Sequence, residues 1–310
     1  MLVSICVITF QRNDGLKRLL EGLNQLTFNK CQIPKIEVVV VDNDANGTAH
    51  LVCEEIKPEF RWPLQYYIET QRGISYARNK AIACTNPEAS FILWIDDDEV
   101  PQPSWLDELL YMQEQTQADV VWGAVLPYFP DKNVPNWVIE GKFFDPPNYN
   151  NGQVVNLAAT NNTLSRTEIF KKLDKFFDER FALTGGSDTH FFWRVHKMGF
   201  KIVWAKAAIV NEWIPQSRTK LKWVFQRSYR SGIIYSVCER EFESNFQRQI
   251  IRFIKGVVLI IWGSVLVIPY LLAKRHIFIW NLLKIARGTG TISGLLGVMK
   301  YHEYKQVHKV

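Results

Sequence analysis

Cysteine is scarce in this sequence and follows no pairing or ligand pattern. The chain has five cysteines, an odd number, and no two of them form a C-x-x-C pair. This usage argues against a disulfide framework and a zinc site, and it is typical of reduced thiols in the cytosol. A secretory signal is also lacking, since Met1 leads directly into the strand-like residues 2–8. We therefore expect a chain that stays in the cytosol.

Glycine-rich phosphate-binding motifs are absent as well. No G-x-G-x-x-G follows the first expected strand, and G-x-x-x-x-G-K-[ST] occurs nowhere in the chain. A nucleotide phosphate is therefore not held by a dinucleotide fingerprint or a P-loop. A metal that bridges carboxylates to a diphosphate is the obvious substitute, with Arg72 or Arg78 as a second clamp. No Ser/His/Asp or Cys/His arrangement is recognisable either, so nucleophilic catalysis is not supported.

Charge is unevenly distributed over the 310 residues, although the net charge is only +6. The first 214 residues contain 21 basic and 27 acidic side chains, whereas residues 215–310 contain 16 basic and 4 acidic ones. A basic tail behind an acidic front predicts that the tail meets an anionic surface. Nucleic acid is the weaker explanation, because a long apolar stretch lies within this tail.

That apolar stretch covers residues 256–273, which contain no charged side chain. Its length is near the lower limit for crossing a bilayer, and Pro269 interrupts it. Basic residues flank it on both sides, Lys255 before it and Lys274 and Arg275 after it. A re-entrant or interfacial segment on the cytoplasmic leaflet therefore fits as well as a full span. A core helix is the alternative.

Strands alternate with helices in the first 119 residues. Apolar and β-branched runs predict strands at 3–10, 36–41, 64–68 and 91–95, with helices at 14–26, 49–56, 75–84 and 105–115. This alternation predicts βαβ units and a mostly parallel sheet flanked by helices. The pattern then changes: residues 128–151 are rich in proline, asparagine and aromatics and predict an ordered loop. Further expected elements are strands at 154–159, 202–204 and 208–210, and helices at 166–173 and 184–198.

Four consecutive acids, Asp96 to Glu99, follow directly after the expected strand at 91–95. A second acidic group, Asp42 to Asp44, ends the strand at 36–41. The carboxyl ends of neighbouring parallel strands open into one crevice, so both groups should project into it. Adjacent carboxylates repel one another, and Mg²⁺ or Mn²⁺ would relieve this repulsion through the oxygen ligands that these ions prefer. A solvated acidic loop is the alternative.

Asp188 follows two glycines and opens the helix expected to run to about residue 198. One interpretation is helix capping, in which Ser187 or Asp188 satisfies the free amides of the first turn. The other is a general base at a helix start, reached through a flexible glycine hinge. His190 and His196 are ordinary helix residues in either case, because no acid lies at metal-ligand spacing from them.

Taken in order, these motifs resemble family 2 glycosyltransferases of the GT-A fold, over residues 1 to about 232. The resemblance implies Asp42 as the acid that hydrogen-bonds the nucleobase, Asp96 directed toward the ribose and Asp98 toward a metal. It implies Asp188 as the catalytic base, and it gives Asp97 no role. The residues expected at the sugar nucleotide are Thr9, Phe10, Arg12, Asp42, Arg72, Gly73, Arg78, Asn79, Asp96 and Asp97.

The chain departs from the family pattern at two positions. Ser187 stands where the family usually has Glu, and Glu212 stands near the place where many members have a His as an extra metal ligand. The second ligand beside Asp98 is therefore expected to be Glu212, and the alternative is that this ligand is missing. The acceptor side is expected at Asn161, Asn162 and Ser187, and the nearby loop 133–151 offers aromatics that could stack on sugar rings.

These expectations together predict an inverting glycosyltransferase that depends on Mn²⁺ or Mg²⁺ and moves a sugar from a nucleotide-diphosphate donor to a hydroxyl of a glycan or lipid-linked acceptor. The expected domains are a GT-A catalytic domain, 1–220, with a nucleotide-sugar half (1–119) and an acceptor half (120–220), and a helical extension, 221–310. The extension should contact the cytoplasmic face of the cell membrane through residues 250–300. The alternatives are a nucleotidyltransferase and a catalytically silent, sugar-nucleotide-binding scaffold on the membrane. The sequence names neither the donor sugar nor the acceptor, the linkage or the oligomeric state.

Overall fold

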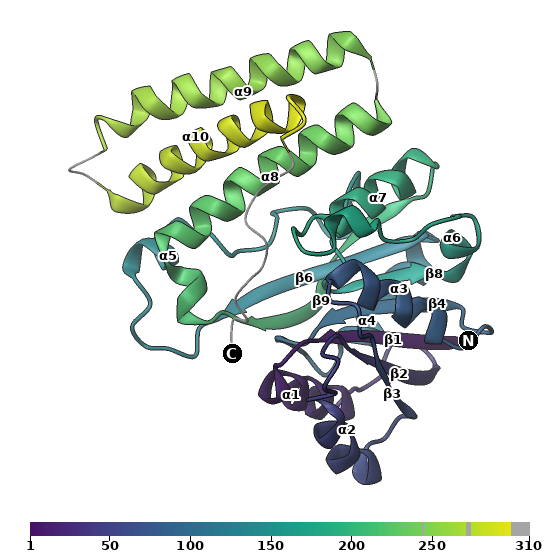
Figure 1. The fold of residues 1–310 in the computed structure, drawn as a ribbon. Helices are drawn as coiled ribbons and strands as arrows, with labels where there is room; N and C mark the ends of the chain where they lie inside the picture. The colour runs from purple at the N-terminus through teal and green to yellow at the C-terminus, as the bar shows by residue number, and fades with distance from the viewer. Residues whose placement is uncertain (244, 271–273, 299–310) are drawn as a thin grey trace. The chain divides into compact units, whose positions relative to one another are not determined.

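The computed structural model of this chain describes residues 1–243, 245–270 and 274–298 (Figure 1). These residues form two compact units. The first contains Met1–Tyr128 and Asp145–Trp213, and the second contains Phe129–Phe144 and the described residues from Ile214 onward. A short internal segment thus belongs to the same unit as the C-terminal helices.

The first unit is built on one mixed sheet, in the order β3-β2-β1-β4-β8-β6-β9-β5, with β7 paired to β9. Its strands are β1 (Leu2–Thr9), β2 (Lys35–Asp42), β3 (Leu64–Ile68), β4 (Phe91–Asp96), β5 (Glu99–Pro101), β6 (Val120–Tyr128), β7 (Val154–Val155), β8 (Thr163–Arg166) and β9 (Ile202–Trp213).

The sheet has a parallel half and a mixed half. β3, β2, β1 and β4 are all parallel, as the alternation of strands and helices predicted. β8, which the sequence did not indicate, lies antiparallel between β4 and β6, while β9 is parallel to β6. The α/β architecture with a central sheet and flanking helices is confirmed, and its strictly parallel part is the half formed by the first four strands of that order.

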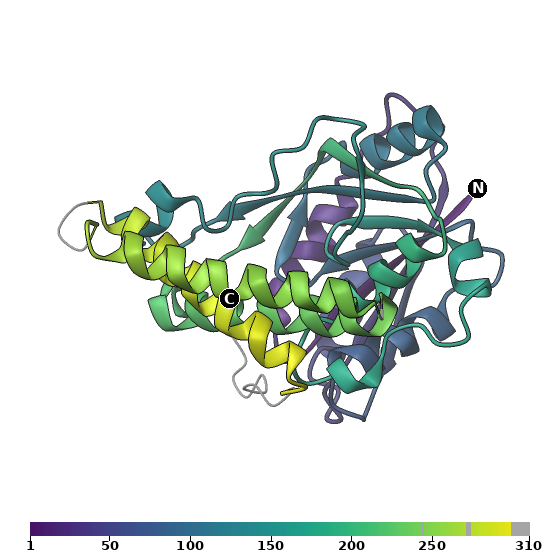
Figure 2. The same cartoon turned by 90° about the horizontal axis from the view of Figure 1, so that it is seen from above.

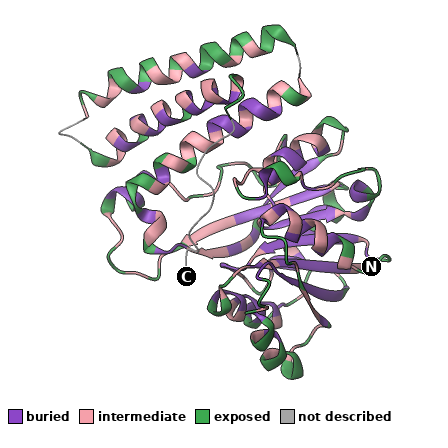
Figure 3. Cartoon of the chain, viewed as in Figure 1, coloured by how far each residue is buried: buried purple, intermediate pink, exposed green. Residues whose placement is uncertain are grey.

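Helices cover both faces of this sheet. They are α1 (Asn13–Asn24), α2 (His50–Ile56), α3 (Ile74–Cys84), α4 (Trp105–Thr116), α6 (Thr167–Lys171) and α7 (Ser187–Lys197), with 3₁₀ turns η1 (Lys57–Glu59) and η2 (Glu179–Phe181). Successive residues of a strand point to opposite faces. Val3, Ile5 and Val7 accordingly pack in one core with leucines of α1 and α4, while Cys6 packs in a second core with alanines of α3 and phenylalanines of α7. Burial on both faces explains why these strands are continuously apolar (Figure 3).

β9 is one long strand where the sequence predicted two short ones, at 202–204 and 208–210. Its pairing with β6 is interrupted by a bulge, because Gly123 pairs with Ala205 and the next residue, Ala124, pairs with Ile209. Residues 206–208 therefore have no counterpart on β6. A bulge of this kind lets a strand continue while it bends, which a periodicity pattern does not reveal.

The second unit is helical. It contains α5 (Asn136–Gly141), the 3₁₀ turn η3 (Gln216–Thr219), α8 (Leu221–Phe242), α9 (Phe246–Val267) and α10 (Arg275–Leu295). α5 forms inside the stretch that was expected to be a loop, and its Trp137 and Val138 pack with Val224 and Ile279. α10 packs against both α8 and α9, and the two views show it running beside them (Figures 1 and 2). The apolar stretch expected at 256–273 ends in residues 271–273, which lie outside the described residues, as do 299–310.

Candidate active site

The two acidic strand ends lie at the same edge of the sheet. In the parallel register Ile8 pairs with Asp96, and the next residue of β1, Thr9, pairs with Asp42. The ends of β1, β2 and β4 are therefore level with one another, which confirms that both acidic groups end on one edge. Asp97 and Asp98 form the turn after β4, and Glu99 begins β5.

Asp97, which was expected near the sugar nucleotide but without a defined role, is a structural anchor of this turn. Its buried carboxylate accepts hydrogen bonds from Thr9 Oγ1, at 2.9 Å, and from Arg12 Nη1, at 2.7 Å. The same Arg12 nitrogen lies 3.1 Å from Asp98 Oδ2. Burial opposes the positive charge of Arg12, but Asp97 and Asp98 outweigh it and raise the pKa of the guanidinium. Thr9 and Arg12 thus bind the acidic turn itself.

The start of α1 also packs against this turn at Gly15. A Cβ added to Gly15 would lie 2.5 Å from the Asp97 carbonyl oxygen, closer than any side chain can come. Only glycine allows this approach, so Gly15 is part of the site's framework. The sequence offered no signal for this role, because the contact joins residues far apart in the chain.

Glu99 and Glu212 add two further carboxylates to the same edge. They are directly opposite each other in the antiparallel pairing of β5 and β9. Glu99 is buried; its Oε2 accepts the amide of Asp96, at 3.0 Å, and its Oε1 has no hydrogen-bond partner among the described residues. Trp213 N donates to the Asp98 carbonyl, at 2.8 Å, and thereby ties the end of β9 to the acidic turn. Glu99 was missed as a site residue, although the unbroken run of four acids contained the signal.

The electrostatics of this edge reflect crowded negative charge. Desolvation raises the pKa of Asp96 to about 7; Arg78 opposes that rise, and Asp98 adds to it. Desolvation likewise raises the pKa of Glu99 well above its usual value, with further contributions from Asp96 and Glu212. Carboxylates that destabilise one another in this way are stabilised by a cation.

The residues present fit a hard divalent ion. The donor set at this edge consists of carboxylate oxygens, and one of them, Glu99 Oε1, is buried without a hydrogen bond among the described residues. Mg²⁺ and Mn²⁺ prefer oxygen ligands of this type, whereas the sulfur and imidazole ligands typical of zinc are not part of the cluster. Asp98 and Glu212 are the side chains we expect to hold such an ion.

The carboxylate of Asp42 accepts hydrogen bonds from groups of the protein itself. Its fully buried side chain accepts the amides of Asp44, at 3.0 Å, and Ala49, at 2.8 Å, and the hydroxyl of Tyr66, at 2.9 Å. Three internal donors occupy most of the roughly four acceptor sites of the carboxylate, so the expected contact between Asp42 and the nucleobase would have to use the capacity that is left on Oδ1. Asp42 shapes the loop 43–49 that follows β2.

Asn43 and Gly73 connect this loop to the start of α3. Gly73 N donates to Asn43 Oδ1, at 2.7 Å, and the Asn43 amide group donates to backbone oxygens of Glu69 and Gln71. Gly73 has φ +146°, and a Cβ there would lie 2.6 Å from the Cβ of Ala182. Glycine is therefore required both by the backbone angle and by the close approach.

Arg72 and Phe10 form a stacked pair beside the ends of β1 and β2. The guanidinium carbon of Arg72 lies 4.9 Å from the centre of the Phe10 ring. Phe10 is half-buried and Arg72 is exposed, so both have surface available to a ligand. A planar cation and an aromatic ring are suited to a nucleobase or a phosphate.

Arg78 links α3 to the start of α7. Its buried Nη1 donates to Ser187 Oγ, at 2.8 Å, and its guanidinium lies 5.3 Å from the Phe177 ring centre. Asn79 is occupied by backbone, since its amide both donates to Phe177 O and accepts from Phe177 N, each at 2.9 Å. Ser187 is fully buried. Ser187 and Asn79 therefore hold neighbouring elements in place; Ser187 is buried away from an acceptor, whereas the half-buried Asn79 keeps one amide hydrogen for the expected nucleotide.

Asp188 lies in the first turn of α7, behind two glycines in the left-handed region. Gly185 has φ +76° and Gly186 has φ +99°, and Gly186 occupies the N-cap position. The N-cap is a glycine without a side chain, and the capping interpretation keeps partial support, because Asp188 accepts the amide of Thr189 in the first turn. Among the residues that the structure describes, the half-buried Asp188 carboxylate accepts this amide, at 2.7 Å, and a weak contact from the Thr189 hydroxyl at 3.5 Å. Much of its acceptor capacity remains open for a substrate.

Asn162, expected on the acceptor side, is instead the centre of the bulge between β6 and β9. It is fully buried with φ +59°, and its Nδ2 donates to the carbonyls of Ala124 and Ala208, each at 2.8 Å. Its Oδ1 accepts the indole N–H of Trp105, at 2.6 Å. The side chain cannot reach an acceptor from there. The preceding Asn161 is half-buried and remains available.

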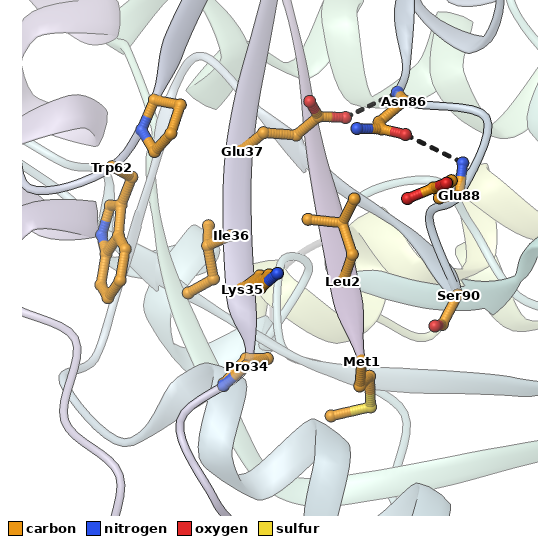
Figure 4. A pocket seen from close by; sticks show the side chains of 11 residues that line it. Met1, Leu2, Pro34, Lys35, Ile36, Glu37, Trp62, Asn86, Glu88 and Ser90 are labelled. Carbon is orange, nitrogen blue, oxygen red and sulfur yellow. Dashed lines mark hydrogen bonds between the residues drawn. The ribbon is translucent and has the colours of Figure 1, made fainter.

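A separate hollow of about 700 Å³ lies at the opposite end of the strands (Figure 4). Met1, Leu2 and Lys35 line it, together with Trp62 and Glu88. These residues belong to the amino ends of β1 and β2 and to connections beside them, whereas the acidic groups follow the carboxyl ends. None of the residues predicted for the site lines this hollow.

Comparison with known proteins places these residues in a family. The sequence model described as "Glycosyl transferase family 2" matches residues 4–174. The succinoglycan biosynthesis protein ExoM of Rhizobium meliloti (strain 1021) is 29% identical over 306 residues, covering 97% of this chain and 95% of that protein. The glucosyl-dolichyl phosphate glucuronosyltransferase of Haloferax volcanii is 22% identical over 256 residues, covering 74% of each chain.

Solved structures share the fold at low sequence identity. Residues 1–349 of TarS from S. aureus, in complex with UDP-GlcNAc, superpose with a TM-score of 0.54 at 16% identity, covering 96% of this chain and 92% of that one. The mannosyltransferase PcManGT from Pyrobaculum calidifontis, in complex with GDP-Man and Mn²⁺, gives a TM-score of 0.55 at 14% identity, covering 96% and 76%. The expected GT-A fold is confirmed by this likeness.

Proposed function

The chain belongs to glycosyl transferase family 2, and from this premise we propose that it is an inverting, metal-dependent enzyme that transfers a sugar from a nucleotide diphosphate to a hydroxyl group. Membership of the family makes it a glycosyltransferase. The configuration, the metal, the donor and the acceptor are the parts that we propose.

One observation carries the proposal: Arg78 joins the acidic edge to the start of α7. Its guanidinium donates to Ser187, the residue before Asp188, and its charge opposes the desolvation that raises the pKa of Asp96 at the end of β4. The arginine thus lies between a carboxylate cluster suited to a cation and a helix start suited to a general base. A diphosphate leaving group and an acceptor hydroxyl need these two environments next to each other.

The reaction that fits is a single displacement. The acceptor oxygen forms a bond to the anomeric carbon while the bond from that carbon to the diphosphate oxygen breaks, so the configuration inverts. Asp188 takes the proton from the acceptor hydroxyl. A divalent ion held by Asp98 and Glu212 would neutralise charge on the departing nucleoside diphosphate.

The donor is a nucleotide-diphosphate sugar. Structures of the same fold contain UDP-GlcNAc or GDP-Man, which supports a donor of this class. We assign the nucleobase and ribose to the ends of β1, β2 and β4, beside Phe10, Arg72 and Asp96, with Gly73 allowing close approach of backbone. Thr9, Asp42 and Asn79 support these positions from behind, through the hydrogen bonds described above.

The acceptor is a glycan or a lipid-linked glycan at the cytoplasmic face of the membrane. One relative is named for succinoglycan biosynthesis and another for the transfer of glucuronic acid to glucosyl-dolichyl phosphate, which supports an acceptor of this chemical class. We propose that residues 1–220 act as the catalytic domain, with Asn161 on the acceptor side, and that residues 221–310 associate with the membrane. α9 is long and apolar enough to cross a bilayer by length and composition.

The decisive experiment replaces the proposed base. Asp188→Asn keeps the size of the side chain but cannot accept a proton, so transfer should fall by about 10²–10⁴-fold. Binding of the donor, followed as thermal stabilisation by sugar nucleotide and Mn²⁺, should stay close to that of the unmodified chain. The control is Asp174→Asn, an exposed acid in the same unit, which should leave both quantities unchanged.

The product distinguishes this function from its alternatives. A glycosyltransferase releases a nucleoside diphosphate from a sugar nucleotide and an acceptor. A nucleotidyltransferase instead releases pyrophosphate from a nucleoside triphosphate and a sugar phosphate, and a silent scaffold releases neither product in either assay. Near-normal transfer by Asp188→Asn would contradict the assignment of the base while leaving the enzyme class intact. Release of pyrophosphate would contradict the proposed reaction itself.

A further inference from the structure

α9 has an outer face that is exposed (Figure 3), and from Ile251 to Val265 this face carries a stripe of apolar side chains. Ile251, Ile254, Val258, Ile261 and Val265 recur at intervals of three or four residues, which places them on one side of the helix. Each of these side chains is half or more exposed, and among the described residues of this unit nothing covers them. A continuous apolar surface of this kind is rare on a soluble monomer and marks an interaction site.

The opposite face of α9 lies directly on α10, and glycines make the contact close. A Cβ at Gly263 would lie 2.7 Å from the Asn281 carbonyl oxygen, and one at Gly256 would lie 3.2 Å from the Gly288 carbonyl oxygen. Gly288 in turn faces the carbonyl of Gly256, so the two backbones approach each other on both sides. α9 and α10 are therefore held together as one closely packed pair.

This close contact determines the depth that α9 can reach. α10 carries Lys284 and the exposed Arg287 within the stretch that touches α9 between Gly256 and Gly263. If α9 crossed a bilayer with its partner attached, both cations would lie near the middle of the hydrocarbon, where charged side chains are strongly unfavourable. α8 on the far side of α10 is equally charged, with Arg227 among its residues.

We propose that α9 lies in the plane of an anionic bilayer surface, with its outer face among the acyl chains and α10 behind it on the aqueous side, and that it does not cross. This specifies the membrane association proposed above and rests on it. The helical unit would then be a monotopic membrane domain, in which α9 alone enters the acyl chains and the charged helices α8 and α10 remain outside them.

Charge and aromatic residues favour a lipid surface over a second copy of this chain. Neither α9 nor α10 contains an acidic residue, whereas both contain basic ones, of which Lys255 and Arg275 are exposed. Two such surfaces facing each other would repel, while anionic headgroups attract them. Trp262 on α9 is 59% exposed, and tryptophan is the side chain that prefers the boundary between headgroups and acyl chains.

Depth measurements with the full chain test the proposal directly. Environment-sensitive probes are placed one at a time at Ile251→Cys, Val258→Cys and Val265→Cys, three positions on the outer face, after Cys31 and Cys84 are replaced by serine. Vesicles containing phosphatidylglycerol carry brominated acyl chains at shallow or deep positions. An in-plane helix predicts equal quenching at all three positions, strongest with the shallow bromines.

A crossing helix gives a different pattern, with Val258 quenched most strongly by the deepest bromines and the two outer positions much less. That pattern would overturn the proposal. Absence of quenching at every position, together with a dimer in sedimentation, would overturn it as well and assign the face to a second copy. Neither measurement uses catalysis, so a failure here is distinct from a failure of the proposed reaction.

A charge on the outer face supplies an independent check. Ile261→Glu should reduce vesicle binding by about tenfold, because one large apolar side chain no longer enters the acyl layer. Its melting temperature in solution should be unchanged, since Ile261 is exposed without lipid. The matched control is Leu51→Glu, which alters a 78% exposed leucine of α2 and should leave vesicle binding intact. Equal binding by both variants would contradict the proposal.

Discussion

Replacing Asn162 tests the role that the structure gives to this side chain against the role that the sequence predicted. Asn162→Ala removes an amide that joins three partners: the indole of Trp105 and the carbonyls of Ala124 and Ala208. All three belong to different elements, namely α4, β6 and β9. The variant therefore removes the hydrogen bonds that link these three elements around the bulge.

The expected magnitude follows from the groups that are left unsatisfied. A buried donor or acceptor without a partner costs about 1–3 kcal/mol, and water could enter the space of the missing amide to offset part of the loss. A total loss of about 3–5 kcal/mol in the free energy of unfolding is therefore expected. This corresponds to a fall of about 10 °C in the melting temperature of a unit of this size.

The backbone angle provides an internal control. Asn162 has φ +59°, a conformation that alanine adopts reluctantly and glycine freely. Asn162→Gly should lose the same hydrogen bonds but recover about 1 kcal/mol relative to Asn162→Ala. Chemical denaturation of both variants, with transfer activity measured in parallel, separates the two contributions. Unchanged stability combined with a raised KM for the acceptor would refute this reasoning and restore the acceptor role.

Further predictions concern the acidic edge and the loop after β2. Asp98→Asn should abolish the thermal stabilisation by Mn²⁺ and donor. Asp97→Asn should keep most of that stabilisation but lower the free energy of unfolding by about 2 kcal/mol, because its bond to Arg12 is weakened. If Asp97→Asn lost the stabilisation and Asp98→Asn kept it in a thermal-shift titration, both roles would be contradicted. Exhaustive EDTA treatment should abolish transfer and Mn²⁺ should restore it, while full activity without metal would rule out the metal role. Tyr66→Phe removes one of three donors to Asp42 and should cost about 1 kcal/mol in denaturation without changing donor binding; a large loss of donor affinity would show that this loop reads the base directly.

The sequence predicted the half of the fold in which each strand and helix carries its own hydrophobic pattern. A parallel strand buried on both faces must be continuously apolar, and the helix that follows it must show one apolar side, so β1 to β4 and their helices were recognisable. β8 is four residues long and antiparallel between β4 and β6, and its polar Thr163 and Ser165 gave no strand signal. The bulge in β9 depends on Gly123 and Asn162, which meet only after the sheet has formed.

The candidate site was predicted by residue type more successfully than by role. Runs of acids at strand ends are visible in a sequence because the repulsion between them needs an explanation. Whether an acid faces a ligand or the protein's own backbone depends on three-dimensional partners, and Asp42 and Asp97 both turned out to have internal ones. Ser187 and Asn79 likewise were recognised as site residues, but they act by holding Arg78 and the chain at Phe177.

The charge balance at this edge argues that donor and cation bind together. The acidic turn 96–99 and Glu212 present five carboxylates. Among the described residues, the arginines whose charges act on these carboxylates are Arg12 and Arg78. Arg12 is already committed to two of the carboxylates. A diphosphate would bring further negative charge to an edge that is negative on balance, so its binding without a cation is electrostatically unfavourable. We therefore expect the donor's affinity to rise steeply with Mn²⁺ concentration, and by linkage the affinity for Mn²⁺ to rise with donor, in calorimetric titrations of each ligand against the other. Independent binding of the two would show that the arginines alone neutralise the diphosphate.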